Sequence, residues 1–285
     1  MPLPRLCGDE PLVKELREVF RANVLRIPEA RVAPLGVLVS RMSLLPSSRL
    51  YRLVGQINSL IGAPPPPLAD GDIGISPMAS LTNRRSRVLD NTTGIEILTG
   101  LLNGLSENEG APEIVTHLRE TNSFRFVFPS MERRYIEIGR IGELLAGRRL
   151  SSTNLLFPTL TDPRTSIQLI DSAITSTGFA IEAGDDDTAT FRFNVDGLKR
   201  ALGAAKITLD ATDAKKLTFR SNRRVTFAFT CVTMTVDAMG AIRGIKPSTT
   251  KVHSPAYAAD AGVEHGMREH VLLTKAPELL ELQLD

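Results

Sequence analysis

The sequence predicts a globular α+β fold that combines long strands with short helices. Hydrophobic residues make up 42% of its 285 residues, which is ordinary for a chain that buries a core, and the length fits one large domain or two small ones. Side chains alternate with period 2 over residues 217–236 and again before Phe128 and within 166–194, which predicts strands. Shorter stretches with helical spacing separate these runs.

Residues 217–236 predict an unusually long strand whose apolar face changes partway along. The apolar residues fall into two sets of opposite parity, Val225, Phe227, Phe229 and Cys231, and then Val232, Met234 and Val236. The apolar face therefore switches near Thr230, and either a β-bulge or a change of packing partner would produce this.

The N-terminal part is predicted to contain helices and strands in alternation. Asp9, Glu10 and Pro11 are typical of a helix start, so a short amphipathic helix is expected just after Cys7. The next predicted elements are two strands, a helix and an extended proline connector, at residues 23–28, 34–41, 48–61 and 64–67.

The middle of the chain predicts a buried helix followed by several strands. Residues 94–105 are apolar on most sides of a helix, whereas 70–91 predict a poorly packed insertion. After it come a strand that ends at residue 128 and, over 135–146, the start of a strand followed by a helix. Residues 166–194 predict hairpins with turns at 176–178 and 184–187, and a helix follows at 195–204.

The C-terminal part predicts a linker and an apolar tail. Residues 240–266 are rich in Gly, Pro, Ser, Thr and Ala and lack apolar periodicity, so we expect an exposed linker. The leucines and valine of 270–284 are too numerous to stay solvated, so the tail is expected to dock on the body. The predicted division is a body of 1–239 and a linker with tail of 240–285.

Charge is unevenly distributed along the chain. Six acidic and two basic residues give 252–285 a net charge of −4, so residues 1–251 carry +6 of the total of +2. Four arginine pairs, at 84–85, 133–134, 148–149 and 223–224, lie in this basic part. Such a body fits an anionic lipid surface or nucleic acid, although solvated loop arginines remain an alternative.

No motif for catalysis or metal binding is present. Phosphate loops, hydrolase and kinase signatures and zinc spacings are absent, so no catalytic residue and no metal site is predicted. Asp185, Asp186 and Asp187 are typical of a charged hairpin turn rather than a cation site. Cys231 alternates with core phenylalanines and is expected to be buried. Without a long apolar run or a signal peptide, the chain is expected in the cytoplasm.

Three stretches, in order, resemble the bacterial gasdermins. They are CGDEPLVKELREVFRANVLRIPEARVAPLGVL (7–38), the block 94–183, and VTFAFTCVTMTV (225–236) ahead of a short tail. The resemblance implies a twisted, mostly antiparallel sheet with surrounding helices and no enzymatic activity. It also implies a C-terminal inhibitory segment that a caspase-like or other protease removes, after which the body forms a homo-oligomeric β-barrel pore.

The resemblance implies further site residues and a route between compartments. A palmitoyl group is expected on Cys7, with a buried thiol as the alternative, and no other cofactor is expected. The chain would be a cytoplasmic monomer before cleavage and would reach anionic lipids of the inner membrane afterwards, in cell death against phage. Charged candidates for the cleavage point in the linker are Arg243, Lys246, Lys251 and Asp260.

A membrane β-barrel needs strands of about 9 to 11 residues with one apolar face. Residues 166–194 can supply such a hairpin, in which Phe179 and Ile181, or Phe191 and Phe193, would face lipid. The alternative for this hairpin is ordinary soluble sheet.

Two other functions fit parts of the sequence. A basic face could bind an acidic partner or nucleic acid, although the chain has no Trp and only three Tyr for stacking on bases. A Cys-dependent hydrolase would require Cys7 to act as a nucleophile.

Overall fold

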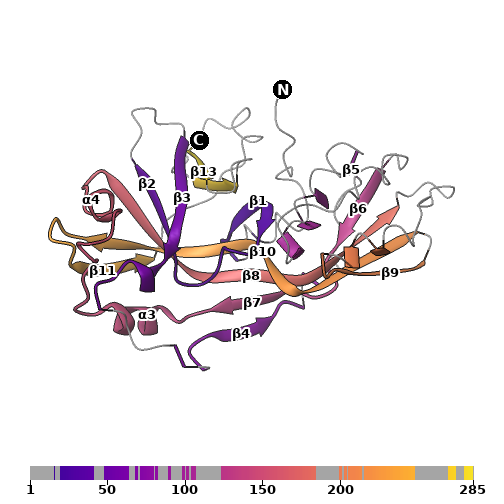
Figure 1. The fold of residues 1–285 in the computed structure, drawn as a ribbon, viewed down its shortest axis with the longest axis horizontal. Coiled ribbons are helices and arrows are strands. Elements are labelled where there is room, and N and C mark those ends of the chain that lie inside the picture. The colour runs from indigo at the N-terminus through magenta and orange to yellow at the C-terminus, as the bar shows by residue number, and fades with distance from the viewer. Residues whose placement is uncertain are drawn as a thin grey trace, which may run out of the picture.

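The fold is organised around one large twisted antiparallel sheet (Figure 1). The structure, a computed structural model, describes residues 16, 20–41, 48–63, 68–69, 71–79, 81–82, 89–90, 98–99, 101–102, 104–106, 123–183, 199–200, 202–203, 205–213, 215–247, 269–273 and 279–284. Its strands are β1 (Asn23–Glu29), β2 (Gly36–Arg41), β3 (Ser48–Gln56), β4 (Gly74–Pro77), β5 (Leu89–Asp90), β6 (Ser123–Val127), β7 (Glu132–Tyr135), β8 (Thr165–Ala183), β9 (Thr208–Asp213), β10 (Lys216–Val236), β11 (Ile242–Pro247), β12 (Glu269–Leu273) and β13 (Leu279–Leu284). Helices η1 (Ile57–Ser59), α3 (Ile138–Leu145) and α4 (Phe157–Leu160) complete the numbered elements, and the predicted α+β class is confirmed.

The centre of the sheet is a ribbon of two long strands, β8 and β10. They contain 19 and 21 residues and pair from Lys216 opposite Glu182 to Met234 opposite Ile167. At about 3.3 Å per residue each strand spans roughly 60 Å, and the long strand predicted at 217–236 is confirmed. The other strands join this ribbon in the order β1-β10-β8-β2-β3-β13-β12, while β6 and β7 pair with β8, and β9 and β11 with β10.

Three clusters of buried side chains cover the ribbon. The phenylalanine core contains Phe126, Phe128, Phe179, Phe219 and Phe227 together with Leu98, Leu101, Leu102 and Leu105. The α3 core contains Ile141, Leu145, Leu60, Ile167, Leu169, Val232 and Met234. The third core contains Leu25, Val32, Leu38, Ile170, Phe229 and Cys231. Because Cys231 and Val232 are neighbours in one strand, the third core and the α3 core lie on opposite faces of the sheet.

Register irregularities explain the apolar pattern of β10. Phe229 and Cys231 face the third core and Met234 faces the α3 core, so the predicted switch near Thr230 is a change of packing partner. At this point Thr230 pairs with Ser172 and Cys231 with Ile170, so β8 carries one extra residue, Asp171.

A second bulge overturns part of the predicted pattern. Thr226 pairs with Thr175 and Ala228 with Ile174, which leaves Phe227 as an extra residue of β10. A bulge of this kind turns the following side chains to the other face. Phe227 and Phe229 were predicted to share a face, and instead they lie in different cores.

Two element predictions are wrong. The turn predicted at 176–178 does not exist, because β8 continues through it; Gly178 is needed there for close approach, since a Cβ would lie 2.4 Å from the Phe219 carbonyl oxygen. The helix predicted at 48–61 is strand β3 followed by η1, since pairing with β2 and β13 overrides the local pattern. The strands predicted at 23–28 and 34–41, the strand ending at 128 and the helix within 135–146 are confirmed.

The C-terminal strands complete the sheet. Strand β11 pairs with β10, so the chain stays in the sheet up to Pro247, although a linker was expected from residue 240. Strand β13 pairs antiparallel with β3, from Leu279 opposite Arg52 to Gln283 opposite Ser48. Strand β12 pairs with β13 and lies beside β1, so the path of strands returns toward its first member (Figure 1).

Candidate functional site

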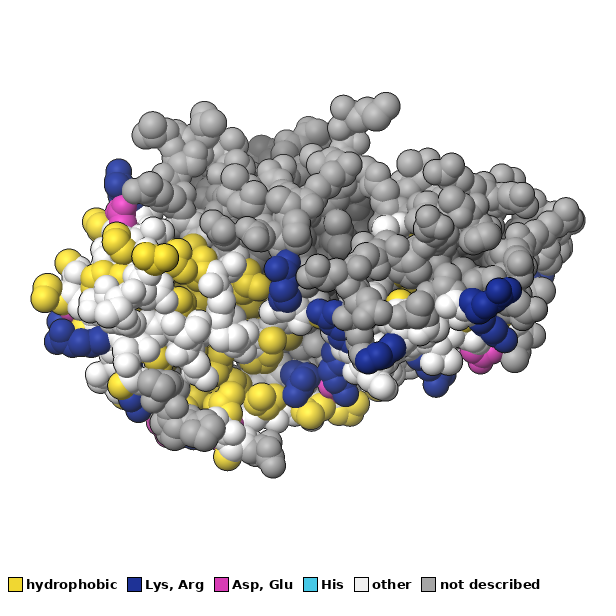
Figure 2. All heavy atoms as spheres, in the orientation of Figure 1, with side chains coloured by type: hydrophobic (Ala, Val, Ile, Leu, Met, Phe, Trp, Pro, Cys, Tyr) yellow, Lys and Arg dark blue, Asp and Glu magenta, His cyan; other side chains and the backbone are white. Residues whose placement is uncertain are grey.

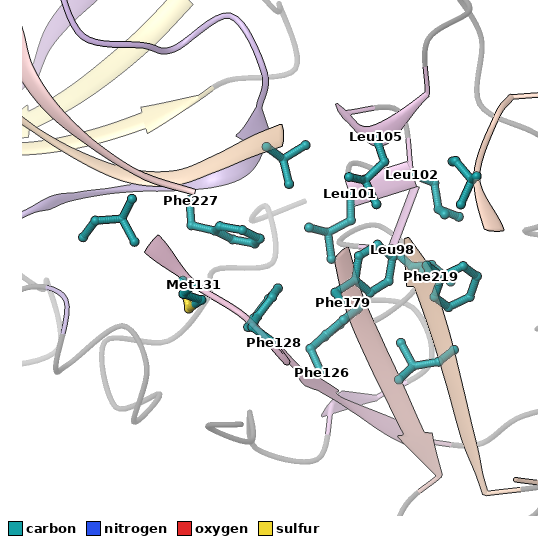
Figure 3. Close-up of a cluster of buried hydrophobic side chains, with 14 of the residues drawn as sticks. Leu98, Leu101, Leu102, Leu105, Phe126, Phe128, Met131, Phe179, Phe219 and Phe227 are labelled. Carbon is teal, nitrogen blue, oxygen red and sulfur yellow. The ribbon is translucent and has the colours of Figure 1, made fainter. Parts of the chain in front are cut away.

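The phenylalanine core covers the end of the ribbon where β8 leads to residue 183 and β10 begins. Phe179 stacks on Phe219 across the two strands with ring centroids 4.9 Å apart, and Phe126 lies 6.0 Å from Phe179. Residues 98–99, 101–102 and 104–105 are helical, and we call them the leucine helix; Figure 3 shows its leucines converging on the phenylalanines. This cover shields an aromatic face of the ribbon from water.

Two of the four predicted lipid-facing residues lie within this core. Phe179 and Ile181 are each 0% exposed and stand two positions apart in β8, so they point to the same face. Phe191 and Phe193 lie outside the described residues. In this state the Phe179 and Ile181 side chains contact protein, and lipid could reach them only after this core, to which the leucine helix contributes, has opened.

A chain of hydrogen bonds crosses the middle of the ribbon. Arg133 Nε on β7 donates to Ser172 Oγ at 3.2 Å, and Thr230 Oγ1 donates to Asp171 Oδ2 at 2.8 Å. The Ser172 and Thr230 hydroxyl oxygens lie 2.6 Å apart, and since Thr230 donates to Asp171, Ser172 is the donor between them. The chain runs from a cation to a carboxylate and ties β7, β8 and β10 together.

Of the two charged residues in this series of hydrogen bonds, Asp171 is buried and Arg133 is half-buried. Burial raises the pKa of its carboxyl above 3.8, while the Thr230 hydrogen bond and the Arg133 charge act in the opposite direction. Among the described residues its Oδ1 has no hydrogen-bond partner. A buried carboxylate that is only half satisfied favours the neutral form and weakens this part of the ribbon.

Residues 221–224 of β10 attach the ribbon to the elements around it. Ser221 Oγ donates to the Leu105 carbonyl at 2.9 Å and Arg223 Nη1 to the Ser106 carbonyl at 2.6 Å, at the end of the leucine helix. Arg224 Nη1 lies 2.6 Å from Glu132 Oε1 of β7 as an ion pair. Sequence reasoning missed this segment, although the polar run SNRR inside a strand was a visible signal.

Basic side chains are prominent on one face of the molecule. Figure 2 shows Lys and Arg along the middle of this face and toward the β9 end, with few acidic side chains, and hydrophobic side chains toward the α4 end. Arg220 and Arg224 are exposed and Arg133 and Arg134 are half-buried. The predicted basic body therefore has basic surface along the ribbon.

The predicted modification and cleavage residues are only partly described. Arg243 and Lys246 are exposed on β11, and Arg243 is ion-paired to Asp237 at 2.6 Å. Cutting beside either residue requires β11 to separate from β10. Cys7, Lys251 and Asp260 lie outside the described residues. Cys231 is buried, as predicted, with Asn23 Nδ2 donating to its Sγ at 3.8 Å.

The described part of the chain has neither a candidate metal site nor a helix that could span a membrane. It contains no group of three His, Cys, Asp or Glu side chains that could hold a metal ion. None of its helices is long and apolar enough to cross a membrane.

Comparison with known proteins places the chain in a family. A sequence model of the Bacterial Gasdermin Family matches residues 25–241, well over half of the chain. The chain belongs to the bacterial gasdermin family. A gasdermin, bGSDM, of a Desulfuromonadales bacterium is 25% identical over 236 residues, which cover 81% of this chain and 83% of that one. The structure of a bacterial gasdermin from Bradyrhizobium tropiciagri matches with a TM-score of 0.56 at 14% identity, over 86% of this chain and 94% of that one, and supports the fold.

Gasdermin membership settles the class of function. Gasdermins are non-enzymatic pore formers, so the prediction that the chain is not an enzyme is confirmed, and membership implies a pore-forming defence protein. It also implies activation by a protease and oligomerisation.

Proposed function

We propose that this gasdermin is held inactive by its C-terminal tail and forms a membrane β-barrel pore when a protease removes the tail. The observation that carries the proposal is the ladder between β13 and β3, which places the end of the chain on the edge of the body sheet. The product is a lethal pore in the inner membrane of an infected cell.

The tail restrains the body by occupying its sheet edges. Strand β13 pairs with five consecutive residues of β3, and β12 lies beside β1 at the other edge of the body. An unpaired strand edge is a template for another chain. Removal of the tail frees the β3 edge for a second copy, so the protein is a monomer before cleavage and a homo-oligomer after it.

The membrane strands come from the end of the ribbon beneath the leucine helix. Barrel strands need about 9 to 11 residues and an apolar face toward lipid. Strand β8 is long enough, and Phe179 and Ile181 supply apolar side chains on one face. In the pore Phe179 and Ile181 exchange their protein contacts for lipid; the alternative is that Phe191 and Phe193 face the lipid.

Charge and acylation direct the body to the membrane. Once residues 252–285 leave with their charge of −4, the remaining body is basic and is attracted to anionic lipids. A palmitoyl group on Cys7 adds a second anchor, because a single acyl chain binds membranes only marginally without help from basic residues.

The activating protease, caspase-like or of another class, cuts between the body and β12. Arg243 and Lys246 lie in a paired strand, whereas a protease needs an extended, accessible substrate, so the outer candidates Lys251 and Asp260 are favoured. We therefore place the end of the body near Pro247 rather than at residue 239.

Dye release from vesicles tests the proposal. A recognition sequence for a specific protease is inserted after Lys251, and a scrambled insert of the same length is the control. Uncut protein should be silent on vesicles of phosphatidylglycerol and phosphatidylethanolamine, and cutting should release the dye only with the intact recognition sequence. Cut protein that binds vesicles without releasing dye would contradict the pore.

A further inference from the structure

The apolar side chains of β10 alternate regularly in the sequence, but in the folded protein they do not all point to one face. In the sequence Val225, Phe227, Phe229 and Cys231 alternate without interruption, as in a straight strand with one apolar face. In the fold the bulge at Phe227 sends Phe227 to the phenylalanine core and Phe229 to the third core. The folded register therefore hides an amphipathic strand that the sequence contains.

A larger irregularity precedes this segment. Arg220 pairs with Gly178 and Val225 with Ser176, so residues 221–224 stand opposite Thr177 alone. Both strands are shaped for it: Ser176 Oγ donates to the Gly178 carbonyl at 2.7 Å, and Gly178 leaves room for the Phe219 carbonyl oxygen. The irregularity is thus a built feature that stores three extra residues in β10.

The side chains of this stored segment hold the leucine helix and β7. Arg223 and Ser221 bond the last carbonyls of the helix, where a cation also interacts favourably with the helix dipole. Arg224 pairs with Glu132 on β7, which itself pairs with β8 beside the irregularity. These contacts exist only while residues 221–224 bulge out of the ribbon.

The tail strands adjoin two strands that contribute to the third core. The third core, which holds Phe229 and Cys231, is lined by Leu25 of β1 and Leu38 of β2. The strand path leads from β2 through β3, β13 and β12 back to β1, so the tail strands close the sheet around this core. Removing them frees β1 and β3, the strands that contribute Leu25 and Leu53 to the core around Phe229.

We propose that β10 is a register switch, with residues 221–224 as its latch. This rests on the proposed pore function. When the tail leaves, Phe229 loses its closed core, the latch releases Leu105, Ser106 and Glu132, and the bulges of β10 are drawn straight. Val225, Phe227, Phe229 and Cys231 then share the lipid-facing side, while Thr226, Ala228 and Thr230 face the lumen. Drawing in three residues lengthens the strand by about 10 Å.

The latch is tested by leakage rates of cut protein. Arg223→Gln and Glu132→Gln should release dye at least about threefold faster than the unmodified sequence, because the latched state is weakened. Arg164→Gln, which removes an exposed arginine ion-paired to Asp162 in the loop before β8, is the matched control and should not change the rate. Equal or slower leakage of the latch variants overturns the latch. If Arg223→Gln does not fold, Ser221→Ala removes one bond and should give a smaller acceleration.

A second readout does not depend on pore formation. In uncut protein, Arg223→Gln should speed amide hydrogen exchange at residues 98–106 and leave exchange in α3 unchanged. Failure of the unmodified cut protein to leak would refute the proposed function, whereas unchanged exchange in this variant would refute the latch.

The straight register is tested by quenching in the pore. Single cysteines at positions 227, 228, 229 and 230, in a chain with Cys7→Ser and Cys231→Ser, carry an environment-sensitive fluorophore. Lipid-attached nitroxide should quench 227 and 229, and aqueous iodide should quench 228 and 230. If lipid-attached nitroxide quenches one of positions 227 and 229 and aqueous iodide quenches the other, the bulge persists in the pore and the switch is overturned.

Discussion

At position 178 the absence of a side chain decides how closely the two ribbon strands approach. A Cβ on Gly178 would lie 2.4 Å from a backbone oxygen, whereas a Cβ on Gly142 in α3 would meet nothing within 4 Å. Gly178→Ala should lower the free energy of unfolding by about 1–3 kcal/mol through overpacking. Gly142→Ala should raise it by about 0.5–1 kcal/mol through helix propensity.

Urea unfolding of both glycine variants measures the contrast. The two midpoints should move in opposite directions from that of the unmodified protein. Equal midpoints would mean that β8 can bend away from Phe219 without cost.

Asp171 should give the protein a characteristic pH dependence. Its folded pKa is raised by burial, so the folded state binds this proton more tightly than the unfolded chain. The resulting contribution to stability is fully present below 3.8 and is lost as pH rises through the folded pKa. Asp171→Asn should therefore gain stability relative to the unmodified protein as pH rises through that window.

Asp237 provides a control of opposite sign. Hydrogen bonds from the Ala241 backbone and Arg243 lower the pKa of its carboxyl, so its contribution is present above 3.8 and is lost as pH falls below it. Asp237→Asn should lose stability at neutral pH and match the unmodified protein in acid. Urea midpoints across pH measure both variants, and parallel curves for the two would contradict the assignment for Asp171.

At the scale of elements, the β13–β3 ladder should set the threshold for activation. Leu282→Pro places a residue without an N–H inside β13, between β3 and β12. Loss of one backbone hydrogen bond, about 1 kcal/mol, shifts the docked population about fivefold. Dye release by uncut Leu282→Pro should therefore rise severalfold, and Leu282→Val should stay silent. Silence of both variants would remove the ladder from the mechanism.

The elements also show where sequence reasoning reached its limit. Apolar and alternating runs identified β1, β2, β6 and the length of β10, although β2 and the middle of β10 are buried on both faces. The prediction failed at Gly178, where a glycine that permits close approach looks like a turn residue. An irregularity was visible only where the apolar alternation of the sequence breaks, between Cys231 and Val232; the bulge at Phe227 leaves no trace in a strictly alternating stretch. The polar run at 221–224 is visible in the sequence, but its partners Leu105, Ser106 and Glu132 are distant in the chain and could not be identified from it.

At the scale of the whole molecule, charge separation predicts salt-dependent membrane binding. The body carries +6 up to residue 251 and the tail −4 beyond it. Cut protein should bind anionic vesicles more weakly at 0.5 M than at 0.05 M salt, because the Debye length falls from over 10 Å to a few ångströms. Co-sedimentation measures this, with phosphatidylcholine vesicles as the control; equal binding to both lipids at low salt would contradict an electrostatic role.

The ladder between β13 and β3 also changes what a cut in the linker means. While the chain is intact, the covalent connection keeps β13 near β3 at a high effective concentration, which is typically millimolar for linked binding partners. After the cut the same strand is a free peptide ligand, and its occupancy depends on its own concentration and affinity. In the proposed mechanism, proteolysis would therefore not end inhibition at once, because the cut tail still inhibits until it is diluted. An infected cell would then pass through an interval in which cut but still inactive gasdermin accumulates. Free tail peptide, added in trans, would extend that interval.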